Sequence, residues 1–83
     1  PIRLNVKKHY TDEAFVLIQK RKKFDKNYFY LSKNKNLREA GKNLYKTLRN
    51  IKRLKFKKIA VEKIPNIGIG QTINDRLKRA SKR

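Results

Sequence analysis

Two glycines separated by one residue, Gly68 and Gly70, have a spacing that suggests chemistry. They follow a short apolar run at residues 59–61 and precede an amphipathic helical pattern. A strand, a glycine-bearing turn and the N-terminus of a helix make up half of a phosphate-binding arrangement, because free amide groups and the helix dipole attract anions there. An anion contact at this turn is therefore one hypothesis.

The complete nucleotide-binding fingerprints are not present around these glycines. The dinucleotide motif needs a third glycine three residues after the second, and Ile73 occupies that position. The lysine and the Ser/Thr residue of a P-loop are missing as well. The sequence therefore favours glycines that serve turn geometry and close packing, and a weak anion contact near Lys63 is the alternative.

Few other side chains could carry out catalysis. The chain has no cysteine, and its single histidine, His9, lies in a polar segment where we expect it to be exposed rather than catalytic. The six carboxylates are dispersed: Asp12 and Glu13 are typical of charges that cap a single helical turn, and Asp75 lies beside Arg76 on a polar helix face. We therefore expect no catalysis, no metal site and no cofactor in this chain by itself.

The charge of the chain is strongly positive, with 25 Lys and Arg residues against six Asp and Glu residues and a net charge of +19. Such a field attracts nucleic acid or anionic lipid. Two interpretations of the excess positive charge stay open: a surface that binds a polyanion, and a solvated surface that reflects an AT-rich codon composition. No apolar run approaches a membrane span and no signal-peptide pattern is present, so we expect a cytoplasmic protein without a membrane partner.

The elements that position these residues can be predicted from apolar patterns. Eighty-three residues form one small domain, with strands expected at residues 2–6, 14–18, 28–32 and 57–63. In the first, an edge strand, Ile2, Leu4 and Val6 share one face. The second is covered on both faces, and Ile59 and Val61 form the core side of the fourth.

Two helices complete the predicted fold. Asn36 and Glu39 form the asparagine version of a capping box, and the apolar period that follows predicts a helix over residues 37–54. Gly41 within it indicates a close approach to a strand, and a second helix begins near Ile69. The order β-β-β-α-β-α predicts a small Rossmann-like α/β domain of two or three layers. In its four-stranded sheet the third and fourth strands, which the first helix connects, run parallel. The short earlier connections allow mixed strand directions for the other strands.

A basic and aromatic run, Lys26–Lys33, raises the hypothesis of a platform on which RNA bases stack. Within the run Tyr28 and Tyr30 alternate with Phe29 and Leu31, as core side chains of a strand usually do. The run also lacks the glycines of the RNP signature, and the element order differs from that of RNA-recognition folds. We therefore favour a core role for these aromatic residues.

Three segments of the chain resemble a known family. NLREAGKNLYKTLR (Asn36–Arg49), KKIAVEKIP (Lys57–Pro65) and GIGQTINDRLKRAS (Gly68–Ser81) are similar to the end of the long-form L-threonylcarbamoyladenylate synthases. The second domain of those enzymes typically closes with IP-x-x-G-L-G-x-A-I-N-D-R-L-x-x-A. PIRLNV at the start is similar to the stretch after their interdomain linker. Lys52 stands where the family pattern has an aspartate, which removes any role that needs a carboxylate there.

This resemblance implies that residues 1–83 are a single C-terminal accessory domain of a longer enzyme whose catalytic YrdC-like domain lies outside this sequence. The parent enzyme is a nucleotidyltransferase that condenses threonine, bicarbonate and ATP into threonylcarbamoyl-AMP for the t6A modification of tRNA. ATP and Mg then belong to the catalytic domain. The accessory domain has a Rossmann-like fold in this family and covers or regulates the catalytic cleft.

The expected partner under this interpretation is the catalytic YrdC-like domain of the same chain, with tRNA as an additional contact. The residues expected at the interdomain surface or at an anion are Gly68, Gly70, Asn74, Asp75 and Arg76. The alternative function is a free-standing basic module that binds tRNA or another RNA.

Overall fold

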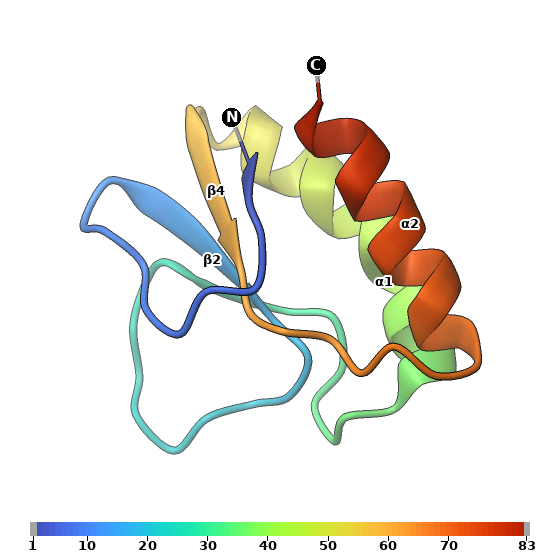
Figure 1. Ribbon diagram of the computed structural model, residues 1–83. Coiled ribbons are helices and arrows are strands. Elements are labelled where there is room, and N and C mark those ends of the chain that lie inside the picture. Colours follow the sequence, from blue (N-terminus) through green and yellow to red (C-terminus); the bar gives the residue numbers. More distant parts are fainter. Residues whose placement is uncertain (1, 83) are drawn as a thin grey trace.

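The computed structural model describes residues 2–82, in which four strands and two helices form (Figure 1). Their order confirms the predicted β-β-β-α-β-α arrangement. The elements are β1 (Ile2–Arg3), β2 (Glu13–Leu17), β3 (Tyr28–Tyr30), α1 (Leu37–Arg53), β4 (Lys58–Val61) and α2 (Ile69–Ser81).

The described strands all run parallel, in a sheet with the order β1-β4-β2-β3. β4 lies between β1 and β2, so that Ala60 is opposite Arg3 on one side and Phe15 on the other. The connections from β1 to β2 and from β2 to β3 contain no helix, yet both return the chain to the same end of the sheet. The mixed strand directions that these short connections allowed do not occur.

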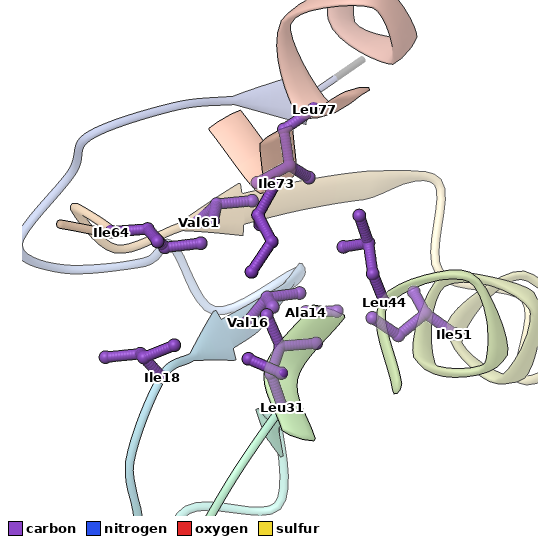
Figure 2. Packing of buried hydrophobic residues seen from close by; sticks show 11 residues of the cluster. Ala14, Val16, Ile18, Leu31, Leu44, Ile51, Val61, Ile64, Ile73 and Leu77 are labelled. Atoms are coloured by element: carbon purple, nitrogen blue, oxygen red, sulfur yellow. The ribbon is translucent and has the colours of Figure 1, made fainter. Parts of the chain in front are cut away.

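Both helices pack on one face of the sheet (Figure 1). Successive residues of β2 point to opposite faces, so that Val16 lies in the core under the helices whereas Phe15 lies on the other side. The predicted burial of residues 14–18 is confirmed. Figure 2 shows the helix-side core, which contains Ala14, Val16, Ile18, Leu31, Ala40, Leu44, Ile51, Val61, Ile64, Ile73 and Leu77.

The opposite side of the sheet, called here the helix-free face, is covered by the two coil connections. Val6 packs there against the small cluster that contains Phe15. The ring of His9 lies 5.3 Å from the ring of Phe15, and the guanidinium of Arg21 lies 5.1 Å from the centroid of the same ring. Because parallel sheets are buried on both faces, these segments take the place of the helices in a three-layer fold.

The first strand is shorter than predicted. Asn5 has a left-handed backbone conformation with a φ of 58°, which ends the extended segment and turns the chain. Asparagine tolerates this conformation better than most side chains. As a result Leu4 packs on the helix side and Val6 on the helix-free face. The prediction that Ile2, Leu4 and Val6 share one face is therefore wrong, although β1 does lie at an edge of the sheet.

Helix α1 begins where the capping box predicts, because Oδ1 of Asn36 accepts a hydrogen bond from the Glu39 N–H at 3.0 Å. Its buried residues lie on one stripe: Ala40, Leu44 and Ile51. Gly41 does mark a close approach, but the neighbour is α2 rather than a strand. A β-carbon at Gly41 would lie 3.2 Å from Cγ2 of Ile69.

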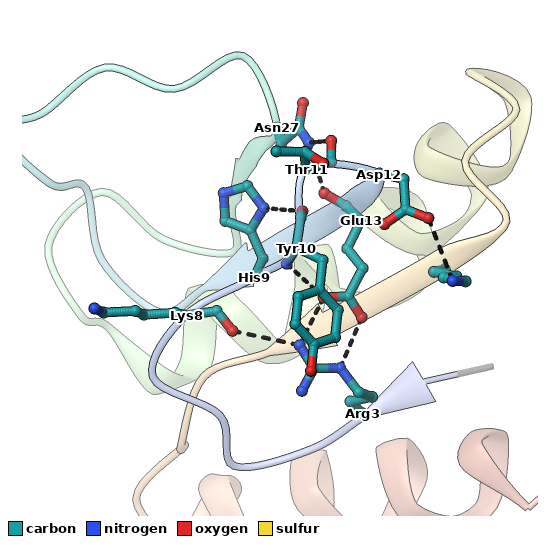
Figure 3. Close-up of polar contacts among 9 residues, drawn as sticks. Arg3, Lys8, His9, Tyr10, Thr11, Asp12, Glu13 and Asn27 are labelled. Carbon is teal, nitrogen blue, oxygen red and sulfur yellow. Dashed lines mark hydrogen bonds and ion pairs between the residues drawn. The ribbon is translucent and has the colours of Figure 1, made fainter.

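An ion pair connects β1 to β2 across β4 on the helix-free face (Figure 3). Nε and Nη2 of Arg3 donate to the two carboxylate oxygens of Glu13 at 2.8 and 2.6 Å. The Tyr10 N–H donates to the same carboxylate at 2.8 Å, and the Arg3 guanidinium lies 4.3 Å from the centroid of the Tyr10 ring. These contacts anchor the first connection over the sheet.

Glu13 was predicted to cap a helical turn, and this prediction is wrong. It is the first residue of β2, its side chain is only 2% exposed, and residues 11–12 form a turn rather than a helix. The hydrogen bonds from Arg3 are the main reason that the pKa of Glu13 is lowered to about 2. The carboxylate is therefore ionised and paired at neutral pH.

Replacing Arg3 by methionine should destabilise the fold at pH 7, because the buried Glu13 carboxylate loses its partner. We expect a loss clearly smaller than the ~3–5 kcal/mol for fully buried pairs, because Arg3 is partly exposed. Glu13 has a folded-state pKa of about 2, below its ordinary value of 4.5. The contribution of the ion pair to stability is therefore complete above about pH 4.5 and is lost as the pH falls toward about 2.

Urea unfolding at neutral pH and near pH 3 measures this effect. The penalty of Arg3→Met should shrink on acidification, because the unpaired carboxyl of the variant can then be protonated. Arg38→Met, at an exposed position of α1, is the matched control and should change stability by less than ~0.5 kcal/mol. A penalty for Arg3→Met that equals the control, or that does not depend on pH, would contradict the role of the ion pair.

Candidate functional site

The C-terminal ends of parallel strands lie at the same end of the sheet. Here the chain leaves the neighbouring strands β2 and β4 toward opposite faces of the sheet. After β4 the chain passes to the helix side, whereas after β2 it passes to the helix-free face. Ligands of open α/β sheets bind where neighbouring strands diverge in this way. The divergence is therefore the position that this fold offers to a ligand.

Glu62 occupies this divergence between the strands. One of its carboxylate oxygens accepts the Ile18 N–H at 2.7 Å, and the other lies 3.2 Å from Nη2 of Arg21. A main-chain amide that could bind a phosphate oxygen is thus bonded to the protein's own carboxylate, whose charge repels anions. The sequence analysis did not single out Glu62. The pattern that could have indicated it is a carboxylate directly after a buried strand, in a chain with only six carboxylates.

The two glycines of the predicted site lie at the start of α2 and have structural reasons to be glycine. Gly68 precedes the helix with a φ of 52°, a conformation that side chains disfavour. A β-carbon at Gly70 would lie 1.9 Å from the carbonyl oxygen of Pro65. The N–H groups of Gly70 and Gln71 donate to carbonyl groups of the same turn, Ile67 and Gly68. Anion binding at this turn stays a prediction.

Asn74 and Asp75 lie together beside a hollow of about 750 Å³ between α2 and the ends of β1 and β4. Nδ2 of Asn74 donates to the Ile64 carbonyl at 3.0 Å, which ties the helix to the segment that follows β4. Asp75 pairs with Arg79 at 3.2 Å and is more than half exposed. The polar residues around this space, called here the α2 hollow, include Glu62, Lys63, Gln71, Asn74, Asp75 and Lys78.

Arg76 lies apart from Asn74 and Asp75. Its guanidinium lies 5.5 Å from the centroid of the Tyr45 ring of α1, a cation–π contact between the two helices. The structure therefore brings two of the predicted residues together at the α2 hollow and places the third at the junction of the helices. The two glycines shape the turn at the beginning of α2.

His9 is less exposed than predicted, with 13% of its side chain accessible. Its Nε2 lies 3.0 Å from a carboxylate oxygen of Asp25, and its ring packs against the rings of Phe15 and Tyr28. The Asn27 N–H and, secondarily, His9 lower the pKa of Asp25. The prediction failed because the connection that carries His9 folds over the helix-free face. Its contacts there give His9 a packing role.

Together these features define a small all-parallel α/β domain, and residues 2–82 contain no group of three or more His, Cys, Asp or Glu residues that could hold a metal ion. The chain matches the family model described as Threonylcarbamoyl-AMP synthase, C-terminal domain, over residues 3–82, and it belongs to that family. The family acts in the t6A modification of tRNA.

No curated protein and no solved structure matches the chain. Neither helix of the described residues is long and apolar enough to cross a membrane.

Gly70→Ala should destabilise the fold strongly, because the added methyl group overlaps the Pro65 carbonyl and the backbone must move. We expect a loss of ~3 kcal/mol or more, at the upper end of overpacking effects. Gly41→Ala is the matched control within the other helix, because its added methyl group meets only side chains, those of Ile69 and Ile73, and alanine has a better helix propensity than glycine by up to ~1 kcal/mol. Thermal and urea unfolding measure both variants. Equal stabilities would contradict the packing reason for Gly70.

Proposed function

We propose that this chain is the non-catalytic C-terminal domain of a threonylcarbamoyl-AMP synthase. It packs on the catalytic YrdC-like domain and regulates the formation of threonylcarbamoyl-AMP from threonine, bicarbonate and ATP for the t6A modification of tRNA. The observation that carries this proposal is the family match over residues 3–82. ATP and Mg belong to the catalytic domain in this proposal, and the present chain contributes a surface.

The α2 hollow is the surface that fits a protein partner best. Its lining contains charges of both signs: the carboxylates Glu62 and Asp75, which pair with Arg21 and Arg79, and the lysines Lys63 and Lys78. A surface with charges of both signs can form paired contacts with another protein.

Two exposed apolar side chains lie at the turn into α2, outside the lining of the hollow. Ile67 and Ile69, at the turn into α2, are 67% and 40% exposed. Exposed apolar groups with a polar rim are typical of protein interfaces. This combination supports docking of the catalytic domain at the α2 hollow and at the turn that Gly68 and Gly70 shape.

The test compares threonylcarbamoyl-AMP formation by the catalytic domain alone and with the 83-residue chain added. The chain should change the rate by at least ~5-fold, the lower end of typical coupling between sites. Asp75→Asn should reduce this effect, whereas Glu39→Gln, which removes another exposed carboxylate at the start of α1, should leave it unchanged. A rate that is the same with and without the chain would reject the regulatory role.

The net charge favours a second function, the binding of tRNA or another RNA. The affinity for tRNA should then fall steeply as salt is raised, because each phosphate contact releases counterions. Fluorescence anisotropy of labelled tRNA measures this dependence. Binding that does not change with salt, or that is undetectable at about 0.15 M salt, the physiological ionic strength, would reject this second function.

A further inference from the structure

The outer edge of β3 and the adjacent face of α1 enclose a groove of about 730 Å³, called here the α1 groove. β3 is the edge strand of the sheet on this side. The helix contributes residues that recur at helical spacing, and the strand contributes two aromatic residues, Phe29 and Tyr30. The helix residues that carry the argument are Asn43, Lys46, Arg49, Asn50 and Arg53.

The groove differs sharply in charge from the α2 hollow. Three of its lining residues, Lys46, Arg49 and Arg53, are cationic and exposed, and none is acidic. None of the ion pairs within residues 2–82 involves these three side chains. Their charges are therefore available to a ligand from outside the chain.

The positions of the three cations form a line rather than a single cluster. They lie on successive turns of α1, and one turn advances ~5.4 Å along the axis. Arg53 is held in place, because its Nη2 donates to Oδ1 of Asn50 at 2.7 Å. A row of positive charges along a groove is complementary to a repeating polyanion, whereas a single small anion would need convergent donors.

Phe29 and Tyr30 line one side of the α1 groove but do not offer free rings on which bases could stack. The ring of Phe29 packs edge-on against Phe56 at 5.7 Å, and Tyr30 packs edge-on against Tyr28 at 6.3 Å. Both are half-buried between core clusters, which agrees with the core role predicted for this run. A ligand in the groove would therefore be contacted through its backbone charges and not by base stacking.

We propose that the α1 groove binds the phosphodiester backbone of RNA, with Lys46, Arg49 and Arg53 contacting successive phosphates; this names the site of the second function proposed above and rests on that function. The concave shape fits a strand better than a flat membrane surface. Membership in a family that acts in tRNA modification favours RNA over other polyanions as the ligand. The groove and the α2 hollow are lined by different residues, so RNA could occupy one while a protein occupies the other.

The test measures the affinity of the 83-residue chain for labelled tRNA by fluorescence anisotropy. The triple variant Lys46→Gln, Arg49→Gln, Arg53→Gln should weaken binding by about 10-fold or more and reduce the salt slope by about 2–3, roughly one for each phosphate contact. The triple variant Lys20→Gln, Lys22→Gln, Lys26→Gln removes the same charge from exposed positions of the connection after β2. This control should stay within about 3-fold of the wild-type affinity, as expected for distant charges screened by salt.

Glutamine is a good helix former, so the groove variant should keep its helix; circular dichroism checks this. If it does not fold, Lys46→Gln alone should reduce the slope by about 1. Equal weakening by the two triple variants, no tRNA binding by the wild type, or binding only to anionic lipid vesicles would overturn the proposal. Because no catalytic domain is present in this assay, such a failure leaves the proposed docking untouched.

Discussion

A parallel sheet must be covered on both faces, and this chain has helices for only one of them. The other face is closed by two coil connections that depend on ion pairs between neighbouring segments. Arg3 pairs with Glu13 across β4, and Arg21 pairs with Glu62 at the end of β4. Both arginines also lie over aromatic rings of that face. Two of the six carboxylates of this strongly basic chain therefore hold the coil connections against the helix-free face of the sheet.

This construction fills the crevice of the α/β sheet with groups of the protein itself. Glu62 bonds to the main-chain amide at the divergence of β2 and β4, and the Pro65 carbonyl fills the space at the start of α2. The surfaces that remain differ in charge: the α2 hollow has lining residues of both signs, whereas the charged lining residues of the α1 groove are all cationic.

The sequence predicts the features that depend on local pattern. The cap at Asn36 and Glu39, the buried second strand and the element order are local, and all are confirmed. Features that depend on distant neighbours were missed or wrong. Alternation could not reveal that Asn5 turns the chain, nor that Glu13 finds Arg3 across a strand that comes much later in the sequence.

The same division applies to the candidate site. Helical spacing places Asn74 and Asp75 on one side of α2, and glycine chemistry predicts the turn before it. The hollow itself is closed by Leu4 and Asn5 from the other end of the chain, which no local pattern shows. One measurement tests the central claim of two separate surfaces: an amide chemical-shift map of the labelled chain titrated with the catalytic domain and then with tRNA. Separate surfaces predict shifts around Asn74 and Asp75 with the first ligand and around Lys46 and Arg49 with the second. Shifts of one shared set of amides with both ligands would contradict it.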